Sequence, residues 1–266
     1  HINSISAMNG LYLKERHMME HQYQMLNKGA KFGIRHLPIN VQEELQSKYR
    51  GYTILGAYEF LLKHNEISAC MLERESHIKG SEKLGNGCYL FLFEYNGIEY
   101  GIVNAFHPNQ LEHFYDSQNT ILVINCSSET EYKKLALEFI GFFNPQKALK
   151  TSLRGYIYAN KEELCIKNVG TFFNGFHISP SPLEGMFATL RFCTDKYDNK
   201  LHLSQTKLGE LFLDMGYEEE LILSLCNNPY LEYQHRYESL YTICEENNFD
   251  KSIQLIREYL NTQQLA

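Results

Sequence analysis

The stretch that decides the fold is residues 88–106, which read CYLFLFEYNGIEYGIVNAF. Two apolar runs, residues 89–93 and 102–106, lie on either side of the pair Asn96-Gly97. An Asn-Gly pair favours the type I′ turn, because the twist of that turn matches the twist of the strands beside it. The sequence therefore predicts a β-hairpin with Asn96-Gly97 at its turn.

The turn also fixes which residues of the hairpin face each other. Phe91 is expected to face Ile102, and Cys88 is expected to face Ala105. Both faces of the hairpin are then largely apolar. Strands that are apolar on both faces are covered on both sides, so the hairpin is predicted to lie inside a sheet.

A candidate catalytic site follows from this register. His107 has the parity of Ala105, so it is expected to project from the same face as Cys88. A thiol becomes a nucleophile when a base or a cation lies nearby. The hypothesis is a thiol mechanism with Cys88 as nucleophile, His107 as base, and Asn109 or Asp116 to orient the base. The alternative is a buried cysteine of the core and an unrelated surface histidine.

A candidate metal site lies near the N-terminus of the chain. His17, Glu20 and His21 form the pattern H-x-x-E-H. On a helix, two histidines four residues apart share one face and bind zinc, with the Glu as base. Glu94 or Glu99 is the expected third ligand. The alternative is a polar helix face without a metal.

In the rest of the chain, segments with the apolar spacing of a helix alternate with segments that have the apolar pattern of a strand. Helices are predicted at residues 9–28, 40–49, 54–64, 128–143, 204–215, 217–226, 231–247 and 250–261. Further strands are predicted at residues 120–124, 153–159, 164–167 and 186–193. The helix at 128–143 begins with a capping box, Ser128-x-x-Glu131. This order predicts an α+β fold with N-terminal helices and a mostly antiparallel sheet of five or six strands. An α+β domain over residues 1–200 and a helical extension over residues 201–266 are expected.

Composition excludes several classes of protein. The net charge of −7 disfavours a general nucleic-acid binder, which needs a concentrated basic face. No apolar run approaches the ~20 residues of a membrane helix, so no membrane span is expected. The seven cysteines contain no C-x-x-C pair, which favours reduced cysteines in a cytosol. No cofactor is expected. Because the first residue is His1 and not Met, we expect a processed chain or a part of a longer one.

Several short segments together resemble one protein family. They are Arg16-His17-Met18, the hairpin, and Phe106-His107-Pro108-Asn109 at the end of the hairpin. Residues 240–256 show the spacing of an ankyrin-type helix pair. The chain thereby resembles the enterotoxin-like type III effector cysteine proteases. The resemblance implies a papain-like domain followed by ankyrin-like helices.

The chain departs from that family at all three catalytic positions. Glu15 stands where the family has its cysteine, and Gly85 or Asn86 stands near the family's histidine, with His77 a few residues upstream. His107 stands where the family has its aspartate. The resemblance therefore implies an inactive relative or one whose chemistry has moved.

These observations lead to three hypotheses about function. The first is a bacterial effector-like protein that acts on a host protein, as a cysteine-dependent hydrolase or an inactive relative. The second is a protein-interaction domain without enzymatic activity. The third is a zinc hydrolase that uses His17, Glu20 and His21. A protein partner or protein substrate is expected, in the cytoplasm or in a host cytosol after secretion.

Overall fold

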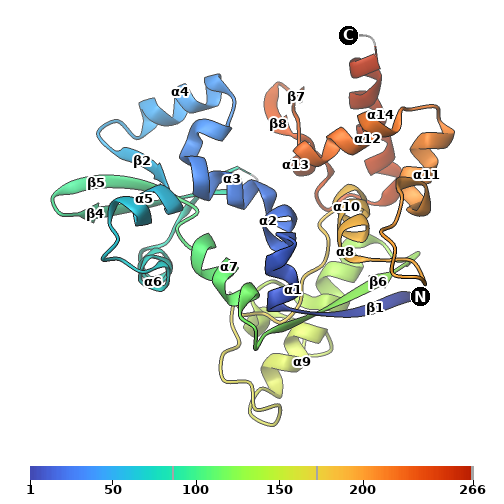
Figure 1. The fold of residues 1–266 in the computed structure, drawn as a ribbon, viewed down its shortest axis with the longest axis horizontal. Helices are drawn as coiled ribbons and strands as arrows, with labels where there is room; N and C mark the ends of the chain where they lie inside the picture. Colours follow the sequence, from blue (N-terminus) through green and yellow to red (C-terminus); the bar gives the residue numbers. More distant parts are fainter. Residues whose placement is uncertain (86, 172, 265–266) are drawn as a thin grey trace. The chain divides into compact units, whose positions relative to one another are not determined.

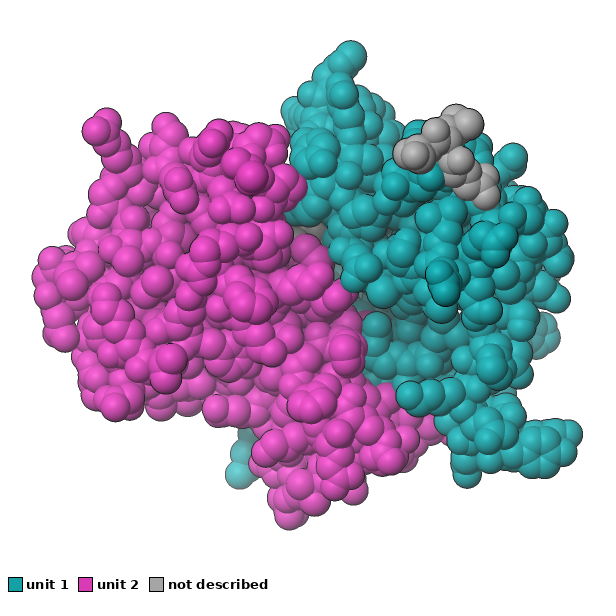
Figure 2. Space-filling view, turned by 45° about the horizontal axis from the view of Figure 1, so that its top comes forward, with its two compact units in different colours: residues 1–4, 125–266 teal, residues 5–124 magenta. Residues whose placement is uncertain are grey.

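The computed structural model describes residues 1–85, 87–171 and 173–264 (Figure 1). Helices and sheets occur together as an α+β fold, which confirms the predicted class. The chain divides into two compact units, residues 5–124 and residues 1–4 with 125–266 (Figure 2). The division does not fall at the predicted boundary near residue 200, because residues on both sides of that point share one hydrophobic core.

The predicted hairpin forms with the predicted register. Strand β4 (Cys88–Tyr95) pairs antiparallel with β5 (Ile98–Val103), and Phe91 faces Ile102. Asn96 has a φ of 50° and Gly97 a φ of 73°. A type I′ turn needs positive φ at both central residues, and few residues other than Asn and Gly tolerate it. The local sequence therefore determines this hairpin.

The hairpin lies in the middle of a four-stranded sheet of order β2-β5-β4-β3. Strand β2 (Thr53–Gly56) runs parallel to β5, and β3 (Glu82–Gly85) runs antiparallel to β4. The interior position of the hairpin in the sheet is confirmed. The expected cover on both faces is incomplete, because Leu92 is 40% exposed. The predicted size of the sheet, five or six strands, is wrong, because the other strands pair separately.

Two separate strand pairs account for the remaining strands. Strand β1 (Ile2–Asn9) pairs with β6 (Thr120–Cys126), and β7 (Tyr230–Tyr233) pairs with β8 (Arg236–Ser239). Strand β6 contains the predicted strand at residues 120–124, but it joins β1 and not the main sheet. Strand β1 itself was not predicted.

The unit of residues 5–124 surrounds the main sheet with short helices. They are α1 (Gly10–Glu15), α2 (Met18–Gln22), α3 (Gln24–Phe32), η1 (Gly33–His36), α4 (Ile39–Lys48), α5 (Ala57–Lys63), α6 (Ala69–Lys79) and α7 (His107–Tyr115). The single helix predicted at 9–28 is divided at His17, which adopts a left-handed φ of 51°, and again at Tyr23, whose ψ of 42° is not helical. Of the helix predicted at 54–64, the first residues belong to strand β2 and most of the others form α5. Phe60, Phe91 and Tyr100 are fully buried in the core between helices and sheet.

Residues 132–159 form short helices. They are α8 (Tyr132–Lys134), the π-helix η2 (Leu135–Gly141), η3 (Pro145–Lys147) and α9 (Leu153–Ala159). The predicted capping box does not cap a helix, because the Ser128 hydroxyl accepts its bond from Thr130 N. The strand predicted at 153–159 is wrong. Ser152 accepts a bond from Gly155 N and so begins a helix there.

The C-terminal helices share a second core. They are α10 (Pro182–Phe192), η4 (Leu203–Gln205), α11 (Lys207–Asp214), α12 (Glu219–Ser224), η5 (Leu225–Asn227), α13 (Leu240–Cys244) and α14 (Phe249–Gln264). The strand predicted at 186–193 is wrong, because Ser181 caps α10 and Pro182 opens it. Residues 164–167 form no strand. The helix predicted at 231–247 is correct only at its end, because β7 and β8 come first. Phe212, Ile222 and Ile256 are fully buried in this core.

Candidate functional site

Cys88, the predicted nucleophile, is the first residue of β4 and is 1% exposed. Burial raises the pKa of its thiol to about 12. A charged thiolate is costly in an apolar environment, and a protonated thiol is a weak nucleophile. At neutral pH the Cys88 thiol is therefore protonated and unreactive.

His107, the predicted base, does not lie on the strand face that its parity suggested. Strand β5 ends at Val103, and Asn104 turns the chain with a left-handed φ of 55°. His107 is the first residue of α7 and is 2% exposed. Burial, with a smaller effect of Lys31, lowers the pKa of its imidazole to about 4. No hydrogen bond or ion pair between Cys88 and His107 occurs among the described residues.

The two predicted orienting residues have other partners. The Asn109 side-chain amide donates to a carboxylate oxygen of Glu73 on α6, and the same carboxylate lies 3.8 Å from His77 Nε2. Asp116 ends α7, and its carboxylate accepts a bond from Gln118 N at 2.8 Å. The structure thus brings Asn109, Glu73 and His77 together, and it leaves Asp116 at a turn. Asn86 lies outside the described residues.

The predicted zinc ligands do not gather into a metal site. His17 Nδ1 lies 3.2 Å from Glu20 Oε1, so these two side chains contact each other. Among the described residues, no three His, Cys, Asp or Glu side chains lie where they could hold one metal ion. Glu94 and Glu99, the expected third ligands, face each other across the hairpin.

Burial of Cys88 makes a direct prediction about its reactivity. We expect iodoacetamide to modify Cys88 in the folded protein at least 100-fold more slowly than the exposed Cys70. Peptide mass spectrometry over time measures both rates in one sample. In denaturant the two rates are expected to become equal. Equal rates in the folded protein would show that Cys88 is accessible and would restore it as a nucleophile.

A group of polar residues that the sequence did not reveal surrounds the start of α10. Glu184 accepts a hydrogen bond from Ser181 Oγ at 3.2 Å. Burial, together with the negative charge of Glu245, raises the pKa of the Glu184 carboxyl to about 7. Burial and the negative charges of Glu246, Glu184 and Glu245 raise the pKa of Tyr132 to about 12. The sequence pattern that could have revealed this group is the capping box Ser181-x-x-Glu184, which lies in an apolar stretch.

Glu184 is expected to make the folded state less stable at high pH than at low pH. Its pKa is higher in the folded state than in the unfolded state, so its stabilising effect is complete below about pH 4.5 and is lost as the pH rises through about 7. We expect Glu184→Gln to raise the free energy of unfolding at pH 8 by roughly 2 kcal/mol and to change it little at pH 4.5. Thermal unfolding at both pH values measures this. Glu210→Gln, at an exposed position of α11, is the control and should show no such difference.

Arg154 is a buried cation that ties parts of the backbone together. Nη1 of its guanidinium donates to Gly141 O at 2.8 Å, and Nη2 donates to Phe176 O at 2.5 Å. Burial lowers the pKa of the guanidinium, and the nearby Tyr132 opposes that shift. The side chain joins the end of η2 to residue 176, and it thereby organises the segment between them.

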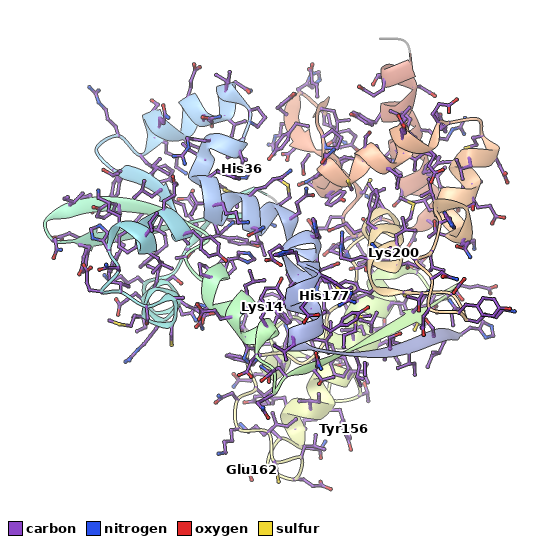
Figure 3. The ribbon with its side chains drawn as sticks, in the orientation of Figure 1. Lys14, His36, Tyr156, Glu162, His177 and Lys200 are labelled. Carbon is purple, nitrogen blue, oxygen red and sulfur yellow. The ribbon has the colours of Figure 1, made fainter. Side chains whose placement is uncertain are left out.

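That segment belongs to a lobe, residues 126–180, which exposes its apolar side chains. Among the described residues of the lobe, no Leu, Ile, Val, Met, Phe or Tyr side chain is buried. Figure 3 shows Tyr156 on α9 and Glu162 in the turn that follows. Eight large apolar side chains of the lobe are exposed, namely Leu137, Phe139, Phe143, Leu149, Tyr156, Leu164, Ile166 and Phe173. Neither hydrophobic core includes a residue of this lobe.

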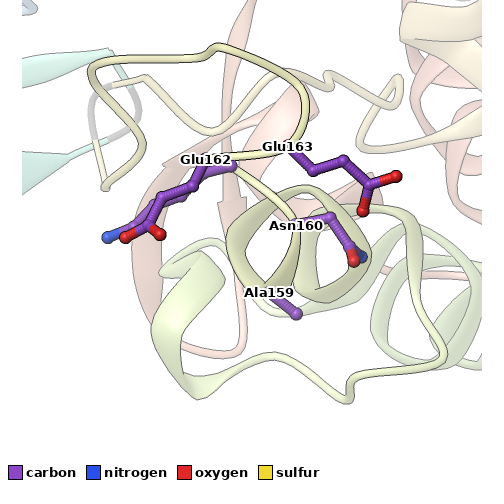
Figure 4. Close-up of a pocket in the computed structure, with 5 residues that line it drawn as sticks. Ala159, Asn160, Glu162 and Glu163 are labelled. Carbon is purple, nitrogen blue, oxygen red and sulfur yellow. The ribbon is translucent and has the colours of Figure 1, made fainter.

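Two recesses of the described surface are open and shallow. One is lined by residues 159–163 alone, in the turn after α9, so a single local segment forms it (Figure 4). Another lies in the unit of residues 5–124, where Lys14, Tyr58 and Asp116 meet beside α7. Neither recess contains Cys88 or His107. Ligand sites are usually deep and apolar, and these recesses are not.

No family model, curated protein or solved structure matches this chain. The resemblance to the effector protease family therefore stays a prediction. Among the described residues, no helix combines the length and the apolar character that a membrane crossing requires.

Proposed function

We propose that this chain is a protein-interaction module that binds its partner through the lobe of residues 126–180. The observation that carries the proposal is the exposure of eight large apolar side chains in a lobe that buries none. Scattered apolar side chains are normal on a surface, but a concentration of them marks an interaction site.

The physical argument concerns what stabilises the lobe. Ordering a residue costs roughly 1–2 kcal/mol of conformational entropy, and burial of apolar surface normally offsets that cost. The lobe has ordered helices held by hydrogen bonds such as those of Arg154, but its apolar surface faces water. A partner that covers Phe139, Phe143 and Tyr156 would supply the missing burial.

Thiol catalysis is the less favoured function. Cys88 and His107 are both buried, and the pKa values of about 12 and about 4 leave both groups neutral at pH 7. A thiol hydrolase needs a thiolate or a base that generates one. The predicted action on a host protein is compatible with a binding module and stays a prediction.

A photo-cross-linking experiment tests the binding function. We expect p-benzoylphenylalanine at position 139 to give one discrete protein adduct in cell lysate, and the same residue at Leu62 to give none. Leu62 is a large exposed apolar residue outside the lobe, so it is a matched control. Phe143→Ser should remove the adduct without lowering the melting temperature. Equal adducts at positions 139 and 62 would contradict the proposal.

A further inference from the structure

The lobe also carries unpaired positive charge around its apolar side chains. Between residues 133 and 150 the chain has four lysines, Lys133, Lys134, Lys147 and Lys150, and one acidic residue, Glu138. All four lysines are exposed. Among the described residues, no carboxylate forms an ion pair with any of them.

Several lysines elsewhere do have partners, which makes the contrast informative. Lys48 pairs with Glu82, and Lys79 pairs with Glu75. Lys63 lies over the ring of Tyr100. The whole chain has a net charge of −7, whereas residues 126–180 contain seven Lys and Arg and five Glu. The lobe is thus a basic region of an acidic protein.

We infer that the partner segment is an amphipathic helix with acidic residues beside its apolar face. This inference rests on the proposed binding function and adds the chemistry of the partner. Helices dock on apolar surfaces through residues at i, i+3, i+4 and i+7. Phe139, Phe143 and Leu149 supply the apolar surface, and Lys147 and Lys150 lie near them in the sequence to meet carboxylates. Complementary charge fixes orientation and excludes wrong partners.

A peptide fits this surface better than an anionic membrane does. Glu138 is exposed between Leu137 and Phe139, and Glu162 and Glu163 are exposed beside Leu164. An anionic bilayer would repel these carboxylates and the acidic remainder of the chain. A helix can place its own polar side chains to avoid them.

The test uses three synthetic 18-residue helical peptides in fluorescence anisotropy with the full chain. All three carry Leu and Phe at i, i+3, i+4 and i+7, and their polar positions are Glu, Gln or Lys. We expect the Glu peptide to bind at least tenfold more tightly than the Gln peptide, and the Lys peptide most weakly. The preference should weaken as salt rises. The double variant Lys147→Glu/Lys150→Glu should lose about tenfold in affinity for the Glu peptide, and Lys83→Glu, at an exposed strand position, should lose none.

The other outcomes separate this inference from the proposed function. Equal binding of the Glu and Lys peptides, or binding of none, overturns the acidic helix. The adduct at position 139 would then still support the binding function. Binding to vesicles of phosphatidylcholine and phosphatidylserine, without binding to the Glu peptide, also overturns the inference and assigns the lobe to a lipid surface. The absence of any adduct at position 139 in the protein without other substitutions overturns the proposed binding function, whatever the peptides do.

Discussion

Asn104→Ala is expected to lower the free energy of unfolding of the 5–124 unit by about 3–4 kcal/mol. The Asn104 side chain is fully buried and makes three hydrogen bonds to backbone groups. Its carbonyl oxygen accepts from Tyr89 N at 2.9 Å, and its amide donates to Leu26 O and Gly87 O, each at 2.8 Å. Alanine would remove all three bonds and leave Tyr89 N and Gly87 O, both part-buried, without this partner. Urea unfolding followed by circular dichroism measures the change.

Two matched variants isolate the hydrogen bonds from the backbone conformation. Asn96 has a φ of 50° and is exposed in the hairpin turn, whereas Asn104 has a φ of 55° and is buried. Asn96→Ala should therefore cost only the left-handed strain, about 1 kcal/mol. Asn104→Gly relieves the left-handed strain but still lacks the three side-chain hydrogen bonds. Its free energy of unfolding should therefore stay lowered by at least about 2 kcal/mol. Equal effects of Asn96→Ala and Asn104→Ala would show that the hydrogen bonds contribute little.

Phe60→Ala and Phe212→Ala are each expected to cost about 3–5 kcal/mol, in different parts of the chain. Both phenylalanines are 0% exposed. Phe60 packs edge-on against Tyr100 with ring centroids 5.1 Å apart, in the core of residues 30–105. Phe212 packs against Tyr217 at 5.8 Å, in the core of residues 183–260. Each substitution removes a large ring and leaves a cavity in only one core.

Hydrogen exchange measured by mass spectrometry locates the two effects. Phe60→Ala should increase exchange most in peptides from residues 53–103, and Phe212→Ala most in peptides from residues 203–260. Phe32→Ala, at an exposed position, is the control and should change neither set. If both core variants increased exchange equally throughout, the two cores would belong to one cooperative unit.

The sequence predicted those parts of the fold that local chemistry determines. Asn96-Gly97 specifies the turn, and the turn specifies the register of β4 and β5. The same reasoning failed at Asn104, which looks like a strand residue between Val103 and Ala105. Asn104 N still donates to Tyr89 O, but its φ of 55° turns the chain out of the strand. Its side-chain amide donates to Leu26 O, a tertiary contact that no local pattern contains.

The wrong strand predictions have a common physical cause. Residues 153–159 contain Tyr156, Ile157 and Tyr158, and residues 186–193 contain Phe187 and Phe192, so composition favoured strands. Ser152 and Ser181 instead cap helices there, and a cap contributes about 1 kcal/mol. The hairpin of β7 and β8 was missed because its turn residues, Gln234 and His235, adopt positive φ without a glycine.

The candidate site was harder to predict than the fold. Facing residues follow from strand register, but burial depends on which helices cover the sheet. Cys88 was placed on the correct strand, while its pKa depends on the helices and strands that surround it. The exposure of the lobe is similarly a property of packing, because Leu137 and Phe139 resemble core residues in the sequence.

The division of the chain into units has a consequence for synthesis on the ribosome. Residues 5–124 are continuous, whereas the other unit combines residues 1–4 with residues 125–266. Synthesis proceeds from the N-terminus at roughly 5–20 residues per second, and domains generally fold as units. The unit of residues 5–124 is therefore complete and able to fold while more than a hundred residues of the other unit remain untranslated. During those seconds residues 1–4 and the apolar lobe emerge before the core of residues 183–260 has formed, and this interval is when a chaperone would be needed.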